Sequence, residues 1–323
     1  MKVLFLCDKK YYDHKMSRVR FHSIEALAQR ADVELLMSGP NWINWDSSRP
    51  AQQNINHIYG NKNTPDIVVG YKPLEILGFS QILAPKCIRY NEMYDVQWTI
   101  KEMLMSRAKY VICHHENDYH KYVRLMANYK NHGIKLFHIA HCAEKSIFKN
   151  YELPKKYDLF LGGATNGVSI LGKHYPLRDR MVGILGKMSK QYNCYLYRHP
   201  GYNLGDALSN KYAIDFAKQI SQSKIAVTCS GKPKSRFGKY IEIPMCGTAL
   251  AADLPEEDQE NFKKFMIEID MAMTDEQIIN KLAYYLDNDE KRQDLVSRGL
   301  EWSKNYTHEK YAERFVNYIG AAL

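Results

Sequence analysis

The 323-residue sequence contains no long apolar run. Its longest apolar segments, at 3–7, 67–70 and 225–227, are far too short to span a bilayer. Charged residues at 8–10 interrupt the first of these segments, so we expect no export signal. A composition with 45% hydrophobic and 25% charged residues also excludes collagen-like, low-complexity and disordered classes.

The sequence also lacks any Cys-x-x-Cys pair. Its seven cysteines are scattered, which is typical of reduced thiols in a cytoplasmic protein. Most of them lie in apolar, strand-like contexts, which favours a role as core residues.

Acidic residues are scarce in the first half of the chain. Residues 1–150 hold 21 Lys and Arg against 14 Asp and Glu, whereas the remaining residues hold 24 against 22. A basic first half indicates an anionic partner, which could be a phosphate, a nucleic acid or a membrane surface. The same charge could equally serve solubility.

Short apolar strands alternate with amphipathic helices, which predicts parallel α/β sheets. The strands expected in the first half are 3–7, 33–37, 66–69, 86–90, 110–113 and 135–140, with helices from Ser17 and over 96–108 and 118–129. A polar segment at 145–157 resembles a linker, and the alternation of strands and helices begins again after it. The strands expected after it are 158–161, 194–197, 225–229 and, as the last one, 248–251, with helices at 177–190, at 240–246 and in the tail.

This repetition predicts two Rossmann-like, doubly wound domains that face a cleft. We expect an acceptor-side domain at 1–150, a nucleotide-sugar-binding domain at 151–300 and a helix at 301–323 that returns to the first domain. Ligands of such sheets bind at the carboxyl ends of the strands.

The densest group of candidate binding residues is the basic segment 230–247. Its cations are Lys232, Lys234, Arg236 and Lys239, and two glycines allow close approach of the backbone to a ligand. The segment follows a predicted strand and leads into a predicted helix at Tyr240, a pattern that suits a diphosphate. A solvated basic loop would give the same pattern.

This segment resembles the donor-binding signature of the GT-B glycosyltransferases. The residues Glu242-Ile-Pro-Met-Cys-Gly247 and those up to Asp253 are similar to the pattern E-A-x-A-x-G-x-P-V. The segments 158–163, 138–148 and 275–311 also resemble parts of that family, so the likeness covers essentially the whole chain. The spacing from Arg236 to Glu242 is similar to that of the CgeB/YkvP-like (group 1) branch.

The resemblance implies that Glu242 holds the ribose and that Arg236 and Lys239 meet the diphosphate. It adds Gly163, His199, Lys232 and Tyr240 to the expected donor-binding residues. Many retaining members carry a glutamate eight residues before the second one, where this sequence has Lys234. The resemblance also implies no cofactor and no metal, because cations and backbone amides would offset the charge of the leaving diphosphate.

The acceptor and a general base are expected in the first half. His14, in the loop after the first strand, is our candidate base, with Asp13 to orient it. Glu92, directly after the strand 86–90, is the second candidate. Two histidine clusters, 114–120 and 138–142, lack the spacing of zinc ligands and suit a lining of the acceptor site better.

Three functions are compatible with these features. The first is a metal-independent transfer of sugar from a UDP- or GDP-sugar to a glycan or another hydroxyl acceptor. The second is the same chemistry on modified nucleic acid, which the basic first half suggests. The third is an inactive protein that binds nucleotide sugars.

Overall fold

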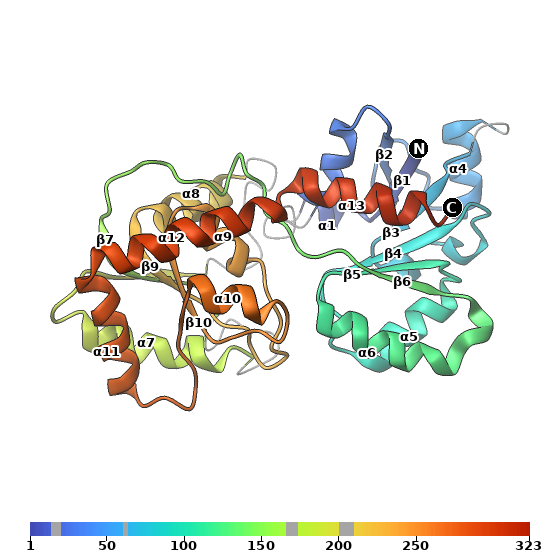
Figure 1. Cartoon of the computed structure of the whole chain (residues 1–323). Helices are drawn as coiled ribbons and strands as arrows, with labels where there is room; N and C mark the ends of the chain where they lie inside the picture. The colour runs from blue at the N-terminus through green and yellow to red at the C-terminus, as the bar shows by residue number, and fades with distance from the viewer. Residues whose placement is uncertain (14–20, 61–63, 166–173, 200–209) are drawn as a thin grey trace. The chain divides into compact units, whose positions relative to one another are not determined.

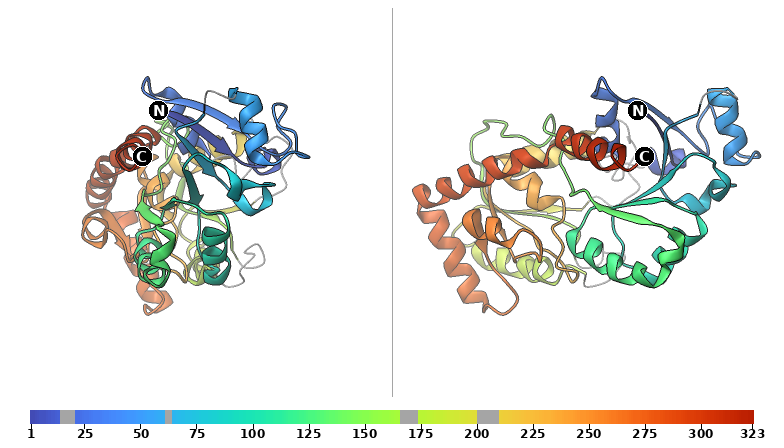
Figure 2. Two further views of the ribbon diagram at one scale, coloured as in Figure 1. Left: turned by 90° about the vertical axis from the view of Figure 1, so that its right-hand side faces the viewer. Right: turned by 45° about the vertical axis from the view of Figure 1, so that its right-hand side comes forward.

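The computed structural model describes residues 1–13, 21–60, 64–165, 174–199 and 210–323. Within these ranges the chain forms two compact units. Unit 1 holds Met1–His141 together with His308–Leu323, and unit 2 holds the described part of 142–307. Each unit consists of a parallel sheet flanked by helices (Figure 1; Figure 2).

Unit 1 is built on a sheet in the strand order β2-β1-β3-β4-β5-β6, with every neighbouring pair parallel. Strands β3 and β5 are buried along their whole length, as expected for strands covered by helices on both faces. The strands are β1 (Lys2–Leu6), β2 (Glu34–Ser38), β3 (Ile67–Gly70), β4 (Lys86–Tyr90), β5 (Tyr110–Cys113) and β6 (Lys135–His138).

The last helix of the sequence, α13 (His308–Gly320), is part of unit 1. Its residues Tyr311, Ala312, Phe315 and Ile319 recur at helical spacing and are fully buried. The helix packs against α3, which confirms the expected return of a C-terminal helix to the first domain. The other helices are α1 (Lys9–Tyr12), α3 (His22–Glu25), α4 (Ala51–Tyr59), α5 (Val96–Met105) and α6 (Glu116–Met126).

Unit 2 is built on a sheet in the strand order β11-β10-β9-β7-β8, again with all pairs parallel. Its strands are β7 (Tyr157–Gly163), β8 (Cys194–Arg198), β9 (Ser223–Val227), β10 (Ala249–Ala252) and β11 (Met266–Glu268). Its helices are α7 (Pro176–Met188), α8 (Lys211–Ser221), α9 (Lys239–Met245), α10 (Gln259–Phe265), α11 (Asp275–Asp287) and α12 (Asp289–Ser303).

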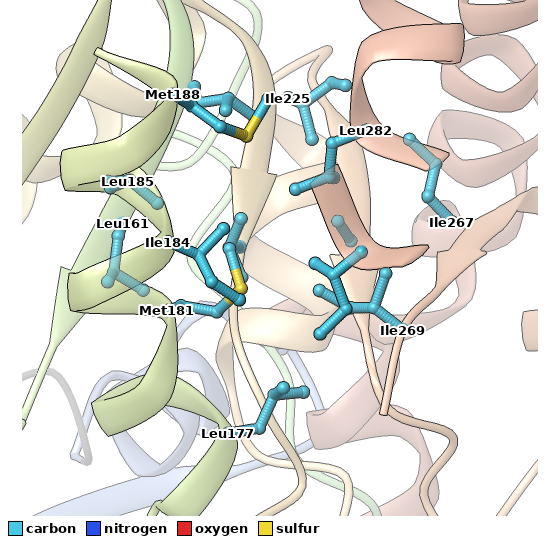
Figure 3. Packing of buried hydrophobic residues seen from close by; sticks show 14 of the residues in the cluster. Leu161, Leu177, Met181, Ile184, Leu185, Met188, Ile225, Ile267, Ile269 and Leu282 are labelled. Carbon is cyan, nitrogen blue, oxygen red and sulfur yellow. The ribbon is translucent and has the colours of Figure 1, made fainter. Parts of the chain in front are cut away.

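Alternate residues of β7 face the two sides of this sheet. Leu159 and Leu161 belong to the core formed with α7 and α11, part of which Figure 3 shows. Phe160, between them, packs edge-on against Phe216 of α8 with ring centroids 5.6 Å apart. This period of two places an apolar side chain on each face, so helices cover both sides.

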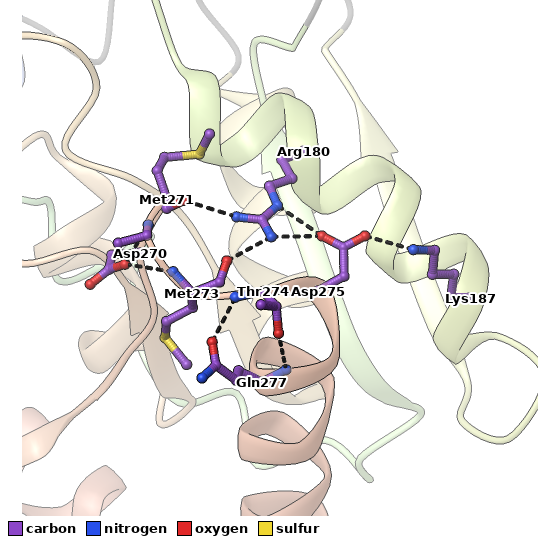
Figure 4. A network of polar contacts seen from close by, with 9 residues as sticks. Arg180, Lys187, Asp270, Met271, Met273, Thr274, Asp275 and Gln277 are labelled. Carbon is purple, nitrogen blue, oxygen red and sulfur yellow. Dashed lines mark hydrogen bonds and ion pairs between the residues drawn. The ribbon is translucent and has the colours of Figure 1, made fainter.

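Polar contacts fix α11 against α7. Arg180 and Lys187, both on α7, bind the two carboxylate oxygens of Asp275 at 2.8 and 2.6 Å (Figure 4). Thr274 and Gln277 form a reciprocal capping box that begins α11 at this point. The start of α11 is therefore positioned by both its own sequence and its neighbour.

The observed strands confirm the predicted α/β class, with one correction. The strand 248–251 was expected to be the last, but β11 follows it and extends the sheet. β11 has only three residues and directly follows α10, so its apolar residues resemble a continuation of that helix. Among the described helices, none has the length and apolar character needed to cross a membrane.

Candidate donor-binding site

The expected donor residues of unit 2 gather where its parallel strands end. β7 ends at Gly163, and β8 ends one residue before His199. Thr228 follows β9, and Asp253 follows β10. Because the carboxyl ends of parallel strands share one edge of a sheet, these four residues lie along the edge where ligands bind in such folds.

Gly163 allows two basic side chains to approach the end of β7. Its φ of +111° is a conformation that favours glycine. A Cβ added there would lie 2.8 Å from Cε of Lys239 and 2.9 Å from Nη1 of Arg178. Any side chain at this position would therefore displace both cations.

Arg178, in the first turn of α7, is buried with only neutral hydrogen-bond partners among the described residues. Its Nη1 donates to the Ala164 carbonyl at 3.0 Å, and its Nη2 donates to Oγ1 of Thr228 at 3.3 Å. Its Nε is buried and has no hydrogen-bond partner in the described part of the chain. A buried cation that is not neutralised by a hydrogen-bonded carboxylate favours an anionic ligand.

Lys239 and Glu242, both on α9, lie beside this arginine. Burial lowers the pKa of Lys239, Glu242 raises it, and Arg178 lowers it further. Burial raises the pKa of Glu242, while Lys239 and Arg178 lower it. Gly238 leaves space for the carboxylate, because a Cβ there would lie 2.8 Å from Oε1 of Glu242.

His199 completes the group, which we call the edge cluster: Gly163, Arg178, His199, Lys239 and Glu242. Burial, followed by the charges of Lys239 and Arg178, lowers the pKa of His199 to about 4. The imidazole is therefore neutral at pH 7 and can accept or donate a hydrogen bond. Four of the predicted donor residues thus come together in unit 2.

Sequence reasoning missed Arg178. It stands between Leu177 and Asp179 in an amphipathic helix, and an arginine in such a position usually lies at the surface. One signal could have indicated its burial. Arg178 precedes Met181 and Leu185 at helical spacing, so it lies on the same buried face of α7.

Two of the predicted donor residues, Tyr240 and Arg236, have partners within the protein. The Tyr240 side chain is fully buried, and its hydroxyl donates to the Asp253 carbonyl at 2.7 Å. Arg236 is 2% exposed, with Nε 3.8 Å from Oε2 of Glu257 and its guanidinium 4.3 Å from the ring centre of Tyr306. Both side chains therefore contact residues that lie outside the basic segment, and their predicted contacts with the donor stay predictions.

Asp253 anchors the basic segment. Its carboxylate accepts hydrogen bonds from the backbone and hydroxyl of Ser230 at 2.7 and 2.6 Å. It also binds Nζ of Lys234 at 2.9 Å. Lys234, which stands where many family members carry a glutamate, is therefore paired with an acid. Lys232 has an exposed side chain, and its backbone N–H donates to the His174 carbonyl.

Of the two candidates for the general base, the structure describes only Glu92. His14 lies outside the described residues. Glu92 is exposed on the loop after β4, while nearby Asp95 caps α5 through the backbone of Trp98 at 2.9 Å. A further motif to consider is Asp-x-Asp, which holds the metal ion in metal-dependent glycosyltransferases. The single Asp-x-Asp triplet of the sequence, at 287–289, lies between α11 and α12, where Asp289 pairs with Arg292. This triplet is at a helix junction and not at the carboxyl edge of a strand, where ligands of such sheets bind.

A comparison with protein families finds one match in this chain. Residues 177–317, somewhat less than half of the chain, match the family described as "Glycosyl transferase-like". No curated protein matches the sequence.

Solved structures show the same fold over nearly the whole length. Sucrose-phosphate synthase from Thermosynechococcus elongatus has a TM-score of 0.62 at 11% identity, with 100% of both chains covered. HepE from Anabaena, in complex with UDP and glucose, has a TM-score of 0.63 at 8% identity, covering 99% of this chain and 100% of that one. A glycosyltransferase from Rickettsia africae has a TM-score of 0.60 at 13% identity, covering 98% and 97%.

The two parallel-sheet units are those of the GT-B fold. With the matched glycosyl transferase-like domain, they identify the protein as a glycosyltransferase.

Proposed function

We propose that this glycosyltransferase takes its sugar from a UDP-linked donor, with a GDP-linked donor as the alternative, and transfers it to a hydroxyl group without a divalent metal. The observation that supports the proposal best is the edge cluster. Arg178 and Lys239 converge on Gly163 at the carboxyl edge of the unit 2 sheet, a place suited to a diphosphate.

The chemistry of this site follows from its charges. When the bond between the anomeric carbon and the diphosphate breaks, negative charge develops on the leaving oxygen. Arg178, which is buried, and Lys239, which is half-buried, would offset that charge in a site where electrostatic interactions are stronger than in water. Glu242 would accept hydrogen bonds from the hydroxyls of the nucleoside ribose.

Structural neighbours support the choice of UDP. HepE has been crystallised with UDP and with UDP-glucose. The pneumococcal O-GlcNAc transferase GtfA, in complex with UDP and GlcNAc, has a TM-score of 0.52 at 14% identity and covers 79% of this chain and 56% of that one. The sequence similarity of 236–242 to the CgeB/YkvP-like branch is compatible with the same donor chemistry.

The acceptor we propose is a glycan or another hydroxyl compound. The basic first half keeps modified nucleic acid as the alternative acceptor. A DNA duplex that bound with a steep dependence on salt concentration would favour that alternative.

Calorimetric titration with UDP and GDP in EDTA tests the donor site. We expect binding by the wild type, and a loss of about 1.5–3 kcal/mol of binding free energy in Arg178→Ala and in Lys239→Ala, since each removes a charge-assisted contact. Lys291→Ala, an exposed lysine of α12, is the matched control and should bind as the wild type does.

The possible outcomes separate the alternatives. Absence of binding by either nucleotide in EDTA, with recovery on addition of Mg²⁺ or Mn²⁺, would contradict metal independence. Absence of binding under all conditions would contradict the donor site. Binding without hydrolysis or transfer of any UDP-sugar would point to an inactive binding protein.

A further inference from the structure

Helices α5 and α6 form one layer on the sheet of unit 1. The chain passes from β4 through α5 to β5 and from β5 through α6 to β6, and these strands are successive neighbours in the sheet. Right-handed crossovers in the same direction place both helices on the same face. Their inner sides share one core, in which Met103 of α5 and Tyr122 of α6 are fully buried (Figure 1). The outer sides of the two helices therefore face the same way.

Large apolar side chains are exposed on this outer side. Trp98 and Met105, both on α5, are 49% and 54% exposed. They stand seven residues apart, which is two turns of a helix, so they lie on one stripe. Val123 of α6 is 42% exposed. Apolar groups gathered in this way on two adjacent helices are typical of an interaction surface.

Cations accompany these apolar groups. Lys101 lies between Trp98 and Met105 in the sequence, and its Nζ is 5.4 Å from the centre of the Trp98 ring. Arg124 follows Val123 on α6 and is exposed. Neither Lys101 nor Arg124 forms an ion pair with a described residue. The segment 96–135 holds seven cations, all of them exposed or half-buried: Lys101, Arg107, Lys109, Lys121, Arg124, Lys130 and Lys135.

Carboxylates are scarce in the same segment. Residues 96–135 contain three, and two of them, Glu102 and Asp118, are buried. The third, Glu116, is half-buried, and its Oε1 lies 3.7 Å from Nε2 of His120. The outer side of the layer is therefore positively charged as well as partly apolar.

This combination matches the surface of an anionic lipid bilayer. Lysine and arginine bind anionic head groups, while tryptophan and other apolar side chains enter the interfacial region. A nucleic acid duplex would pair with the cations and leave Met105 and Val123 in water. A second copy of the same face would bring like charges together.

We propose that the outer side of α5 and α6 docks the protein reversibly on an anionic membrane. This surface, which we call the α5–α6 face, consists of Trp98, Lys101, Met105, Val123 and Arg124. All five residues belong to unit 1 and none belongs to the edge cluster, so the proposal does not depend on the proposed function. Of the anionic partners that a basic first half suggests, it selects the membrane surface.

Co-sedimentation of the full-length protein with lipid vesicles tests the charges of this face. We expect binding to mixed vesicles of phosphatidylcholine and phosphatidylglycerol, and at least roughly tenfold weaker binding to phosphatidylcholine alone. The double variant Lys101→Ala/Arg124→Ala should bind the mixed vesicles roughly 25-fold more weakly, about fivefold for each cation. The matched control is Lys190→Ala/Lys291→Ala, at exposed lysines of unit 2, and it should bind as the wild type does.

Trp98→Ala tests the apolar part of the face. It should weaken binding to the mixed vesicles roughly tenfold, because less apolar surface leaves water. Tyr284→Ala, at an exposed aromatic residue of α11, is the control and should change nothing. Lipids with brominated acyl chains should quench the tryptophan fluorescence of the wild type and not that of Trp98→Phe.

Several results would overturn the proposal. The first is that the wild type does not bind the mixed vesicles, and the second is that either the double variant or Trp98→Ala binds them as the wild type does. Tighter binding to a DNA duplex than to the vesicles would assign the face to nucleic acid instead. Calorimetry with UDP on the same variants should give the wild-type affinity, so failure of the docking surface can be told apart from failure of the donor site.

Discussion

Arg236 and Glu257 form a buried pair. The backbone N–H of Arg236 donates to Oε1 of Glu257 at 2.8 Å, and its Nε lies 3.8 Å from Oε2. Each side chain is only 2% exposed. This pair attaches the basic segment, on which the edge cluster depends, to the loop that follows β10.

The pair predicts a loss of stability in Arg236→Ala. Removing one partner leaves the charge of Glu257 buried and uncompensated, so the free energy of unfolding should fall by about 3–5 kcal/mol. Urea denaturation measures this change. Arg298→Ala removes an exposed pair with Asp294 and should cost at most about 1 kcal/mol. Equal stability of the two variants would contradict the structural role of Arg236.

Gly163→Ala should weaken UDP binding more than it weakens the fold. The new Cβ would displace Lys239 and Arg178, and the φ of +111° adds strain of about 1–3 kcal/mol. Gly183→Ala is the matched control, because a Cβ at that helical position meets nothing within 4 Å. It should raise stability by up to about 1 kcal/mol and leave calorimetric UDP affinity unchanged.

His199 predicts a loss of stability in mild acid. Its pKa is lowered from 6.5 in the unfolded chain to about 4 in the fold, so the unfolded state binds the proton first as the pH falls. Its contribution to stability is complete above pH 6.5 and is lost on the way down to pH 4. Melting temperatures across this range should fall more steeply for the wild type than for His199→Gln.

Bound UDP should reverse part of this shift. A diphosphate between Arg178 and Lys239 would place negative charge beside the imidazole, which raises the pKa of His199. NMR titration with and without UDP measures the change, with exposed His57 of α4 as an internal reference. A pKa of His199 that is the same in both titrations would place the diphosphate elsewhere.

Asp253→Ala should destabilise the basic segment. The change removes acceptors for Ser230 and Lys234 and leaves buried donors unpaired, at a cost of about 2–4 kcal/mol. Asp253→Asn should cost less, since it keeps one acceptor oxygen. Asp294→Ala, at an exposed position, serves as the control in thermal denaturation.

The sequence was sufficient for the fold because its signals are local. Short apolar strands such as 110–113 and helical spacing such as that of 177–188 are visible within a few residues. β11 was missed because it has only three residues, which are too few to show the alternation of apolar and polar residues that marks a strand.

The site was only partly predictable because its partners are distant in sequence. Gly163, His199, Lys239 and Glu242 were expected from the strand ends and from the family resemblance. Nothing near Arg236 or Tyr240 shows that Glu257 and Asp253 would hold them. Arg178 was missed because its partners, Ala164 and Thr228, are distant from it in the sequence.

The order of the segments in unit 1 has a consequence for biosynthesis. This unit is made from Met1–His141 and from α13, and all of unit 2 is encoded between them. During translation the second unit can therefore reach its native state before α13 leaves the ribosome. Until then α3 and the buried Arg89 lack the helix that covers them, since Arg89 normally donates to the hydroxyl of Tyr311. The nascent first unit thus exposes apolar surface until α13 has been made, and of the two units it is the one that would depend more on chaperones.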